Sequence, residues 1–394
     1  MKKFLAMILA LAMVAMCFTA CGKKEEKPTE PAQDSQDTGA DTEKADIKVA
    51  MITDYGDITD QSFNQTTYEA CKSFCEAGSI EFTYKKPASD SDEDRIAMIE
   101  AAIDEEFNVI VMPGYAFANA IKATAADNAD VTFIGLDVSA GDLGDDYEVP
   151  ANLYCAVYQE ELCGYMAGYA AVKLGYTKLG FLGGMAVPAV VRYGYGFVQG
   201  ADAAAAEMEL TDVEINYAYG NQFFGDADIT AAMDTWYADG TEIVFACGGG
   251  IYTSAVDAAV KVDGKVIGVD VDQAGVIAAY AAGEGGDPAE FEDLTVTSAM
   301  KGLAPTVKTM LASVLDGSFK GGQIETLGLV SEVPAENFVQ IAGSTQFGEG
   351  FAEADYESLV GALYAGDITV SADIEAAAAD MATVVAVNDL GNLK

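Results

Sequence analysis

Polar and aromatic side chains follow the first apolar run of this chain, and their types suit ligand binding. The segment Thr53–Gln65 reads TDYGDITDQSFNQ. Asp60 or Ser62 is expected to cap the helix that begins there by accepting a backbone N–H. Phe63 and Asn64 lie beyond that cap, so we expect them to reach the end of the strand, where a ring and an amide can contact a small molecule.

Similar residues follow several later apolar runs. They occur in Pro113-Gly114-Tyr115, Asp137, Gly220-Asn221-Gln222-Phe223-Phe224, Cys247-Gly248-Gly249-Gly250, Asp270-Val271-Asp272-Gln273 and Thr297-Ser298-Ala299-Met300-Lys301. In open α/β sheets, ligands bind at the carboxyl ends of the strands, so these segments are candidate binding loops. No G-x-G-x-x-G motif follows the first run, which disfavours the common dinucleotide-binding fold. The segments offer no nucleophile paired with a base, which favours binding over covalent catalysis.

The elements that must position these loops alternate along the chain from Ile47 onward. Strands are predicted at Ile47–Ile52, Ile80–Tyr84, Val109–Met112, Val131–Leu136, Lys178–Leu182, Val213–Tyr219, Ile243–Cys247, Lys265–Val269 and Leu294–Ala299. Helices are predicted at Phe63–Glu76, Arg95–Glu106, Ala118–Asn128, Gln159–Leu174, Tyr193–Glu207, Ala227–Ala238, Ile251–Val260 and Pro305–Leu315, and a tail follows at Tyr356–Leu363. Apolar strands alternating with helices indicate an α/β fold, in which helices cover both faces of parallel sheets.

The length of this region predicts two domains. About 350 residues exceed what one such core accommodates, so we expect two doubly wound parallel-sheet domains. We assign residues 47–150 and 271–320 to an N-terminal lobe, and residues 151–270 and 321–394 to a C-terminal lobe. Two such lobes facing each other would form a ligand cleft that closes by hinge motion.

The composition excludes several classes of function. The chain carries 63 acidic against 21 basic residues, a formal net charge of -42, and no histidine. Nucleic acids and anionic lipids need basic patches, so neither is an expected partner. The lack of histidine removes histidine-based triads and metal sites. We therefore predict no cofactor, no metal and no enzymatic activity.

The first residues predict the location of the protein. Residues 1–21 combine a basic start, a short apolar run and small residues before Cys21, as in a secretory signal of the lipoprotein type. The thiol of Cys21 would carry lipid and become the new N-terminus. Residues 22–46 contain no aromatic residue and little to bury, so we expect a disordered tether. We predict a protein anchored by lipid on the extracytoplasmic face of the cell membrane.

The cysteines of the body do not indicate disulfides or zinc. They are Cys71, Cys75, Cys155, Cys163 and Cys247. An odd number excludes a complete set of disulfides, and zinc would need further ligands. We expect most of them to be buried small apolar residues.

Taken together, the motifs resemble the basic membrane protein (BMP) family of lipoproteins. The similar segments are Asp60–Gln65, Ile134–Asp137, Gly180–Gly184, Gly196–Ala201 and Ile267–Gln273. The resemblance covers almost the whole chain from Lys48 onward. It implies the type I periplasmic-binding fold, with three crossings between the lobes. It also implies a substrate-binding protein that delivers a purine nucleoside to the permease and ATPase subunits of an ABC importer.

The resemblance also implies roles for single residues. Asp137 corresponds to an aspartate that accepts hydrogen bonds from the purine, as a carboxylate is able to do. Phe63 on one lobe, and Phe223 or Phe224 on the other, correspond to rings that sandwich the base. Stacking of that kind contributes about 1–3 kcal/mol per base. Which of the two adjacent phenylalanines stacks stays open.

The remaining predicted contacts concern the ribose and the walls of the pocket. The same resemblance implies that Asp54 and Asn64 hold ribose and that Asp270 and Lys301 contact its hydroxyl groups. The backbone of Gly248-Gly249 would allow close approach to the sugar, and Tyr115 would line the pocket.

Two other functions remain open from the sequence. A surface-anchored nucleoside hydrolase would hold a calcium ion with Asp54, Asp57 and Asp60 to activate water. A ligand sensor would present the closed lobes to a receptor rather than to a permease.

Overall fold

The computed structural model describes residues 45–144 and 146–394. The predicted signal, the predicted lipidation site Cys21 and the predicted tether up to residue 44 lie outside these residues. Within the described part of the chain, no helix is both long and apolar enough to cross a bilayer.

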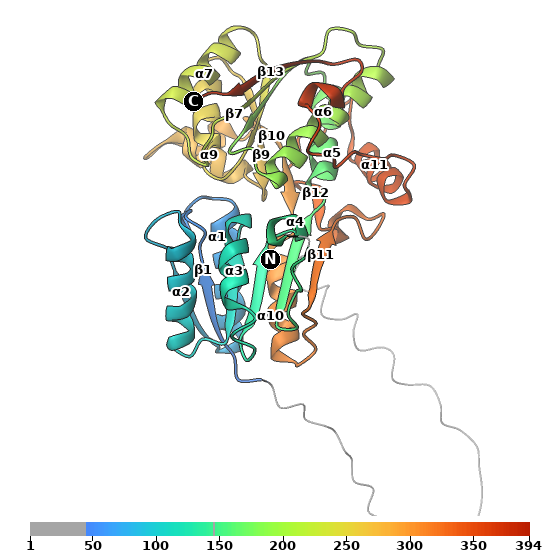
Figure 1. Cartoon of the computed structure of the whole chain (residues 1–394). Helices are drawn as coiled ribbons and strands as arrows, with labels where there is room; N and C mark the ends of the chain where they lie inside the picture. Colours follow the sequence, from blue (N-terminus) through green and yellow to red (C-terminus); the bar gives the residue numbers. More distant parts are fainter. Residues whose placement is uncertain (1–44, 145) are drawn as a thin grey trace, which may run out of the picture. The chain divides into compact units, whose positions relative to one another are not determined.

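The first sheet is six-stranded and parallel, in the order β11-β5-β4-β3-β1-β2 (Figure 1). Its strands are β1 (Lys48–Ile52), β2 (Glu81–Lys85), β3 (Val109–Pro113), β4 (Thr132–Leu136), β5 (Leu153–Tyr158) and β11 (Gln323–Leu327). The accompanying helices are α1 (Phe63–Gly78), α2 (Asp92–Asp104), η1 (Tyr115–Phe117), α3 (Ala118–Thr124), α4 (Ala140–Leu143) and α10 (Leu303–Leu315). Helix α1 packs beside α10, and α2 packs beside α3. Every residue of the central strand β3 is buried, as expected for a sheet covered on both faces.

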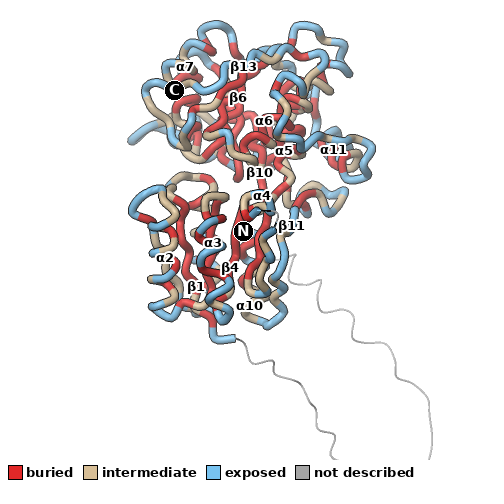
Figure 2. Tube along the Cα trace, viewed as in Figure 1, coloured by how far each residue is buried: buried red, intermediate tan, exposed pale blue. Residues whose placement is uncertain are grey.

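The second sheet is seven-stranded, in the order β12-β10-β9-β8-β6-β7-β13. Its strands are β6 (Lys178–Gly183), β7 (Glu214–Tyr219), β8 (Ile243–Cys247), β9 (Lys265–Asp270), β10 (Thr295–Lys301), β12 (Val339–Ile341) and β13 (Ala386–Asn392). The helices of this part are α5 (Glu160–Lys173), α6 (Pro188–Glu207), α7 (Ala227–Ala238), α8 (Tyr252–Ala259), α9 (Ala274–Ala282), η2 (Pro288–Phe291), η3 (Pro334–Glu336), α11 (Glu353–Ala365) and η4 (Ala378–Met381). Only β12 among these strands runs antiparallel, against β10. Figure 2 shows the buried residues concentrated in the strands and in α5 and α6.

The chain crosses between the two sheets three times, after Tyr158, after Lys301 and after Leu327. This topology confirms the predicted α/β architecture with two parallel-sheet domains and three crossings. We use "N-lobe" for residues 45–158 and 302–327, and "C-lobe" for residues 159–301 and 328–394.

The predicted lobe boundaries at 150, 270 and 320 are wrong in detail. Strand β5, which the sequence reading did not recognise, pairs with β4 and β11, so residues 151–158 belong to the N-lobe. Strand β10 pairs with β9, which places residues 271–301 in the C-lobe. Strand β11 returns residues 321–327 to the N-lobe. A strand belongs to the sheet whose strands it pairs with. The apolar pattern along one segment does not reveal which strand will be its partner.

Helices α5 and α6 pack with their backbones in close contact. A Cβ atom on Gly168 of α5 would lie 2.0 Å from the carbonyl oxygen of Phe197, and one on Gly200 of α6 would lie 1.9 Å from that of Tyr165. Gly164 and Gly196 are equally restricted by the opposite helix. Only glycine permits this approach, so the two helices form one rigid unit of the C-lobe.

The cysteines of the body are free and buried, as predicted. Cys71 and Cys75 lie on the buried face of α1.

Candidate ligand-binding site

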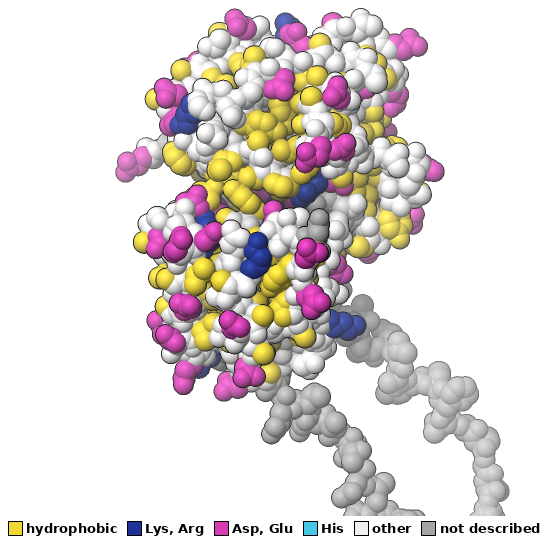
Figure 3. Space-filling view, viewed as in Figure 1, with side chains coloured by type: hydrophobic (Ala, Val, Ile, Leu, Met, Phe, Trp, Pro, Cys, Tyr) yellow, Lys and Arg dark blue, Asp and Glu magenta, His cyan; other side chains and the backbone are white. Residues whose placement is uncertain are grey.

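A cavity of about 540 Å³ lies between the N-lobe and the C-lobe. This is within the usual size of small-molecule sites. Its walls are the loops that follow the carboxyl ends of the strands of both sheets, as the fold predicts. Figure 3 shows hydrophobic side chains bordering the hollow between the lobes, with acidic side chains spread over the rest of that face.

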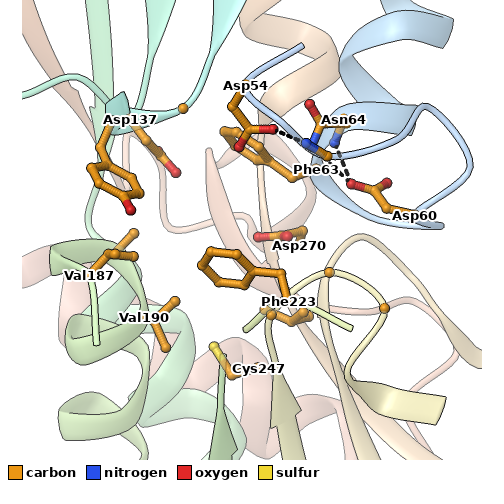
Figure 4. A pocket seen from close by; sticks show the side chains of 18 of the residues that line it. Asp54, Asp60, Phe63, Asn64, Asp137, Val187, Val190, Phe223, Cys247 and Asp270 are labelled. Atoms are coloured by element: carbon orange, nitrogen blue, oxygen red, sulfur yellow. Dashed lines mark hydrogen bonds between the residues drawn. The ribbon is translucent and has the colours of Figure 1, made fainter. Parts of the chain in front are cut away.

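The structure brings all of the predicted ligand-binding residues together. Those that line the cavity are Asp54, Phe63, Asn64, Tyr115, Asp137, Phe223, Phe224, Gly248, Gly249, Asp270 and Lys301. Figure 4 shows the carboxylates of Asp137 and Asp270 and the rings of Phe63 and Phe223 around the same space. Convergence of these residues agrees with the predicted site, and their contacts with a ligand remain predictions.

The N-lobe wall is held by hydrogen bonds within one loop. Asp60 accepts the backbone N–H groups of Ser62, Asn64 and Gln65 at 2.9, 2.9 and 3.0 Å. Asp60, not Ser62, therefore caps the start of α1. Its carboxylate also accepts from Asn64 Nδ2 at 3.2 Å, among the contacts drawn in Figure 4. This leaves the buried Asn64 Oδ1 without a hydrogen-bond partner.

Asp54 is fixed in the same loop. Its Oδ1 accepts the backbone N–H groups of Tyr55 and Gly56, both at 2.6 Å. Burial raises the pKa of the Asp54 carboxyl group and outweighs these hydrogen bonds, which lower it.

The aspartates of this loop are not arranged as the calcium site that the alternative function, a nucleoside hydrolase, would need. Asp57 pairs with Lys86 at 3.0 Å, and the carboxylates of Asp54 and Asp60 are engaged by backbone N–H groups. Among residues 45–144 and 146–394, no group of three or more acidic or cysteine side chains is arranged to hold a metal ion. These contacts favour a structural role for the three carboxylates.

The C-lobe wall is built from charged groups that neutralise one another. Lys301 Nζ at the end of β10 is 2.5 Å from Asp137 Oδ2, 3.3 Å from Glu160 Oε1 and 3.8 Å from Asp270 Oδ1. Burial lowers the pKa of Lys301, but the three carboxylates outweigh it and raise the pKa overall, so the side chain is an ammonium.

Asp137 is the N-lobe member of this group. Burial, helped by the nearby charges of Glu160 and Asp270, raises the pKa of Asp137 to about 6 against the opposing effect of Lys301. Its second oxygen, Oδ1, is buried and has no hydrogen-bond partner. A ligand that donates an N–H or O–H group there would satisfy it.

Asp137 and Asp270 share an uncommon backbone conformation. Their φ angles are 57° and 65°, in the left-handed region that aspartate tolerates better than most residues. Asp137 directly follows β4, and Asp270 is the last residue of β9. The left-handed backbone at these positions turns the chain so that both residues line the cavity. Strained backbone of this kind concentrates at binding sites.

Aromatic rings line both walls. Lys301 Nζ lies 4.8 Å from the centre of the Phe63 ring. The Phe223 ring lies 6.4 Å from that of Tyr55, so it reaches the opposite lobe. Gly184 and Gly248 leave room for it, since a Cβ atom there would lie 2.3 and 2.9 Å from Phe223 Cδ1.

Phe224 differs from its neighbour. This residue is 60% exposed and lies among the residues that line the cavity. The geometry therefore favours Phe223 as the ring facing a ligand.

Several residues of the site were missed by the sequence reading. Tyr55 lines the cavity, and its hydroxyl group contacts Met185 Sδ of the C-lobe at 3.3 Å. Arg192 also lines it and donates to the buried Glu160 at 2.7 Å. Tyr55 stands in the recognised loop and its aromatic type was a usable signal. Glu160 follows the end of β5, a strand that the sequence reading did not recognise, and Arg192 lies within α6. Only the fold joins them to Lys301.

Comparison with known proteins identifies the family. A family model described as ABC transporter substrate-binding protein PnrA-like, the Bmp family, matches residues 47–334. The chain belongs to this family. The resemblance predicted from its motifs is confirmed, and the protein is an ABC transporter substrate-binding protein of the BMP type.

Individual proteins with similar sequences support this family assignment. The "ABC transporter nucleoside-binding protein BmpA" of Lactococcus lactis subsp. cremoris is 29% identical over 303 residues, covering 73% of this chain and 80% of that protein. "Basic membrane protein A" of Borreliella burgdorferi is 28% identical over 287 residues, covering 72% and 76%. The "CD4+ T-cell-stimulating antigen" of Listeria innocua is 27% identical over 340 residues, covering 82% and 86%.

Solved structures confirm the fold. A solute-binding protein of an Aeropyrum pernix ABC transporter system superposes with a TM-score of 0.63 at 19% identity, covering 85% of this chain and 90% of that one. One from Conexibacter woesei gives a TM-score of 0.62 at 21% identity, covering 82% and 98%. These similarities support the type I periplasmic-binding fold of this BMP-family chain.

Proposed function

We propose that this protein captures a purine nucleoside between its lobes and passes it to the permease and ATPase subunits of an importer. In this proposal the protein is tied by lipid on Cys21 to the extracytoplasmic face of the membrane. It changes no bond of the ligand. The observation that carries the proposal is a cavity with rings on its walls and two buried, unpartnered acceptor oxygens, Asn64 Oδ1 and Asp137 Oδ1.

The chemistry of these walls suits a flat heterocycle with a sugar attached. Phe63 and Phe223 supply rings from opposite lobes. Stacking of a base on an aromatic side chain contributes about 1–3 kcal/mol to the binding free energy. Asp137 Oδ1 would accept an N–H group of the base. Asp270 and Lys301 would hold the sugar hydroxyl groups, since a carboxylate accepts two O–H bonds and an ammonium donates.

Closure of the lobes is supported by direct contacts across the cleft. Ser62 Oγ of the N-lobe donates to Asp270 Oδ2 of the C-lobe at 2.6 Å. Gln273 Nε2 donates to the carbonyl oxygen of Gln61 at 3.1 Å. In an open form these groups would separate and expose the cavity, as in hinge-bending binding proteins.

The relatives favour the same ligand class. The Lactococcus lactis relative is named a nucleoside-binding protein. Family membership supports the importer partners, and the order of charge, apolar run and cysteine in residues 1–21 supports the lipid anchor.

A thermal-shift screen tests this function. The protein would be heated with purine and pyrimidine nucleosides, free bases and ribose, because a ligand that binds only the folded form raises Tm. We expect purine nucleosides to give the largest shift. Purine nucleosides that leave Tm unchanged would contradict the proposal, and so would free base released during the incubation, which would indicate a hydrolase.

A further inference from the structure

Glu160 is a buried carboxylate that joins two basic residues below the cavity. It is the first residue of α5, directly after the first crossing between the lobes, and its side chain is 0% exposed. One oxygen lies 3.3 Å from Lys301 Nζ, and the other accepts from Arg192 Nε at 2.7 Å. Lys301 in turn is the last residue before the second crossing.

The position of Glu160 is fixed by its helix. Helices α5 and α6 carry Glu160 and Arg192, and these helices are in backbone contact through their glycines. Gly196, one turn after Arg192, faces the backbone of Glu161, since a Cβ atom there would lie 2.1 Å from the Glu161 carbonyl oxygen. The ion pair between Glu160 and Arg192 therefore sits on a rigid support.

The charges divide unevenly between the lobes. Lys301, Arg192, Glu160 and Asp270 all belong to the C-lobe, and their charges balance. Asp137 belongs to the N-lobe and meets Lys301 only when the lobes are together. A buried charge without a partner is strongly destabilising, so Lys301 needs a carboxylate that stays with it when the lobes part.

We propose that Glu160 is a positioning residue that holds the Lys301 ammonium at the floor of the cleft, ready for Asp137 and the ligand when the lobes close. Asp270, at 3.8 Å, is too distant to accept a hydrogen bond from Lys301. Its carboxylate accepts instead from Ser62 Oγ at 2.6 Å and from the Tyr193 hydroxyl group at 3.3 Å, and each of its oxygens keeps a further lone pair for the ligand. Arg192 neutralises Glu160 and keeps it from rotating away. This inference rests on the proposed nucleoside function, in which Lys301 contacts the sugar.

The neighbouring Glu161 provides a matched control. It is also buried on α5, but its Oε2 has no hydrogen-bond partner, and it makes no ion pair with Lys301. Replacing Glu161 by glutamine therefore removes a buried carboxylate one residue away without releasing Lys301.

A second readout follows from the charges around Asp137. The charged and titratable groups that face it are Lys301, Glu160, Asp270, Arg192 and Tyr158. Glu160 raises the pKa of Asp137, so its removal would lower that pKa. An ionised Asp137 accepts the N–H group of the base, and nucleoside affinity should fall as the pH drops below about 6. In E160Q that fall should occur at lower pH, which loss of packing alone would not produce.

The test is calorimetric titration of the full-length protein with inosine, guanosine and adenosine between pH 5 and pH 8, using wild type, E160Q, E160D and E161Q. We expect E160Q to weaken nucleoside binding about 10- to 100-fold, as for residues that orient metal ligands. E161Q should stay within about twofold of wild type, and E160D should fall between wild type and E160Q. Folding is checked for each variant by circular dichroism.

Each alternative outcome is decisive. Folded E160Q with wild-type affinity and an unchanged pH profile would overturn the positioning role while leaving the nucleoside function intact. If E160Q does not fold, E160D decides, because it keeps the charge but shortens the reach; wild-type affinity in E160D would overturn the role. A wild-type protein that binds none of the three nucleosides would overturn the proposed function and this inference together.

Discussion

The two walls of the cleft are organised in different ways. On the N-lobe wall, Asp54 and Asp60 accept hydrogen bonds from backbone N–H groups within five residues of themselves. On the C-lobe wall, Glu160 pairs with Arg192, 32 residues away, and with Lys301, 141 residues away. The first wall depends on one loop, whereas the second depends on the whole fold. Substitutions should therefore have local effects on the first wall and cooperative effects on the second.

The largest effect is expected from removal of the central charge of the C-lobe wall. Lys301→Met would leave Glu160, Asp137 and Asp270 without their shared partner, and breaking a buried ion pair costs about 3–5 kcal/mol. We expect the free energy of unfolding, measured in urea, to fall by that amount, with loss of nucleoside binding. The exposed Lys261→Met, whose partner Asp234 is also exposed, is the control and should change stability little. If the two variants had equal free energies of unfolding, the C-lobe wall would not depend on its buried charges as this comparison requires.

The unpaired carboxylate of the C-lobe should make stability depend on pH. Burial raises the pKa of Glu161 to about 7 from its ordinary value of 4.5. Because the folded protein then holds the proton more tightly, the free energy of unfolding should fall as the pH rises from about 4.5 to about 7. The total is on the order of 2–3 kcal/mol. E161Q should show a flatter dependence in urea titrations across this window, and an unchanged slope would contradict the assignment.

The aromatic contribution of the C-lobe wall should come from one of two adjacent residues. Phe223→Ala removes the ring that faces Tyr55, and we expect nucleoside binding to weaken by about 1–3 kcal/mol. Phe224→Ala is the matched control, because Phe224 is 60% exposed, and the nucleoside affinity of this variant should stay near that of wild type. The reverse order in calorimetric titration would assign the stacking role to Phe224.

The smallest effect is expected on the N-lobe wall. Asp60→Ala removes the cap of α1, a loss of about 0.5–2 kcal/mol in the free energy of unfolding. The nucleoside affinity should decrease modestly, because Phe63 and Asn64 follow this cap. Asp57→Ala in the same loop affects an exposed ion pair and should be nearly neutral. If thermal unfolding shows a larger loss for Asp57→Ala, the capping role of Asp60 is wrong.

The same difference between the walls explains how much of the site was predictable. Asp54, Phe63 and Asn64 occupy one continuous segment, and a strand followed by a helix start places it at the cleft. Asp137, Asp270 and Lys301 were accessible because each ends a strand, although the spacing did not show that Lys301 bridges the two aspartates. Glu160 and Arg192 were not predictable, since their importance comes from contacts with each other and with Lys301, which are far apart in the sequence.

The fold, like the site, was only partly predictable from the sequence. The alternation of strands and helices predicted two parallel-sheet lobes correctly. Residues 151–158 contain the unrecognised strand β5 and were assigned to the second lobe, but the neighbours of β5, β4 and β11, place it in the first. Hydrogen-bond partners that lie far away in the sequence, such as β11, decide where the chain crosses between lobes.

A crystal structure of the protein with a bound purine nucleoside tests the central claim most directly. We expect the base between the Phe63 and Phe223 rings, with an N–H group donated to Asp137 Oδ1. The sugar should lie against Asp270 and Lys301. Density for the nucleoside outside the cavity between the lobes, or a base turned away from Asp137, would contradict this account.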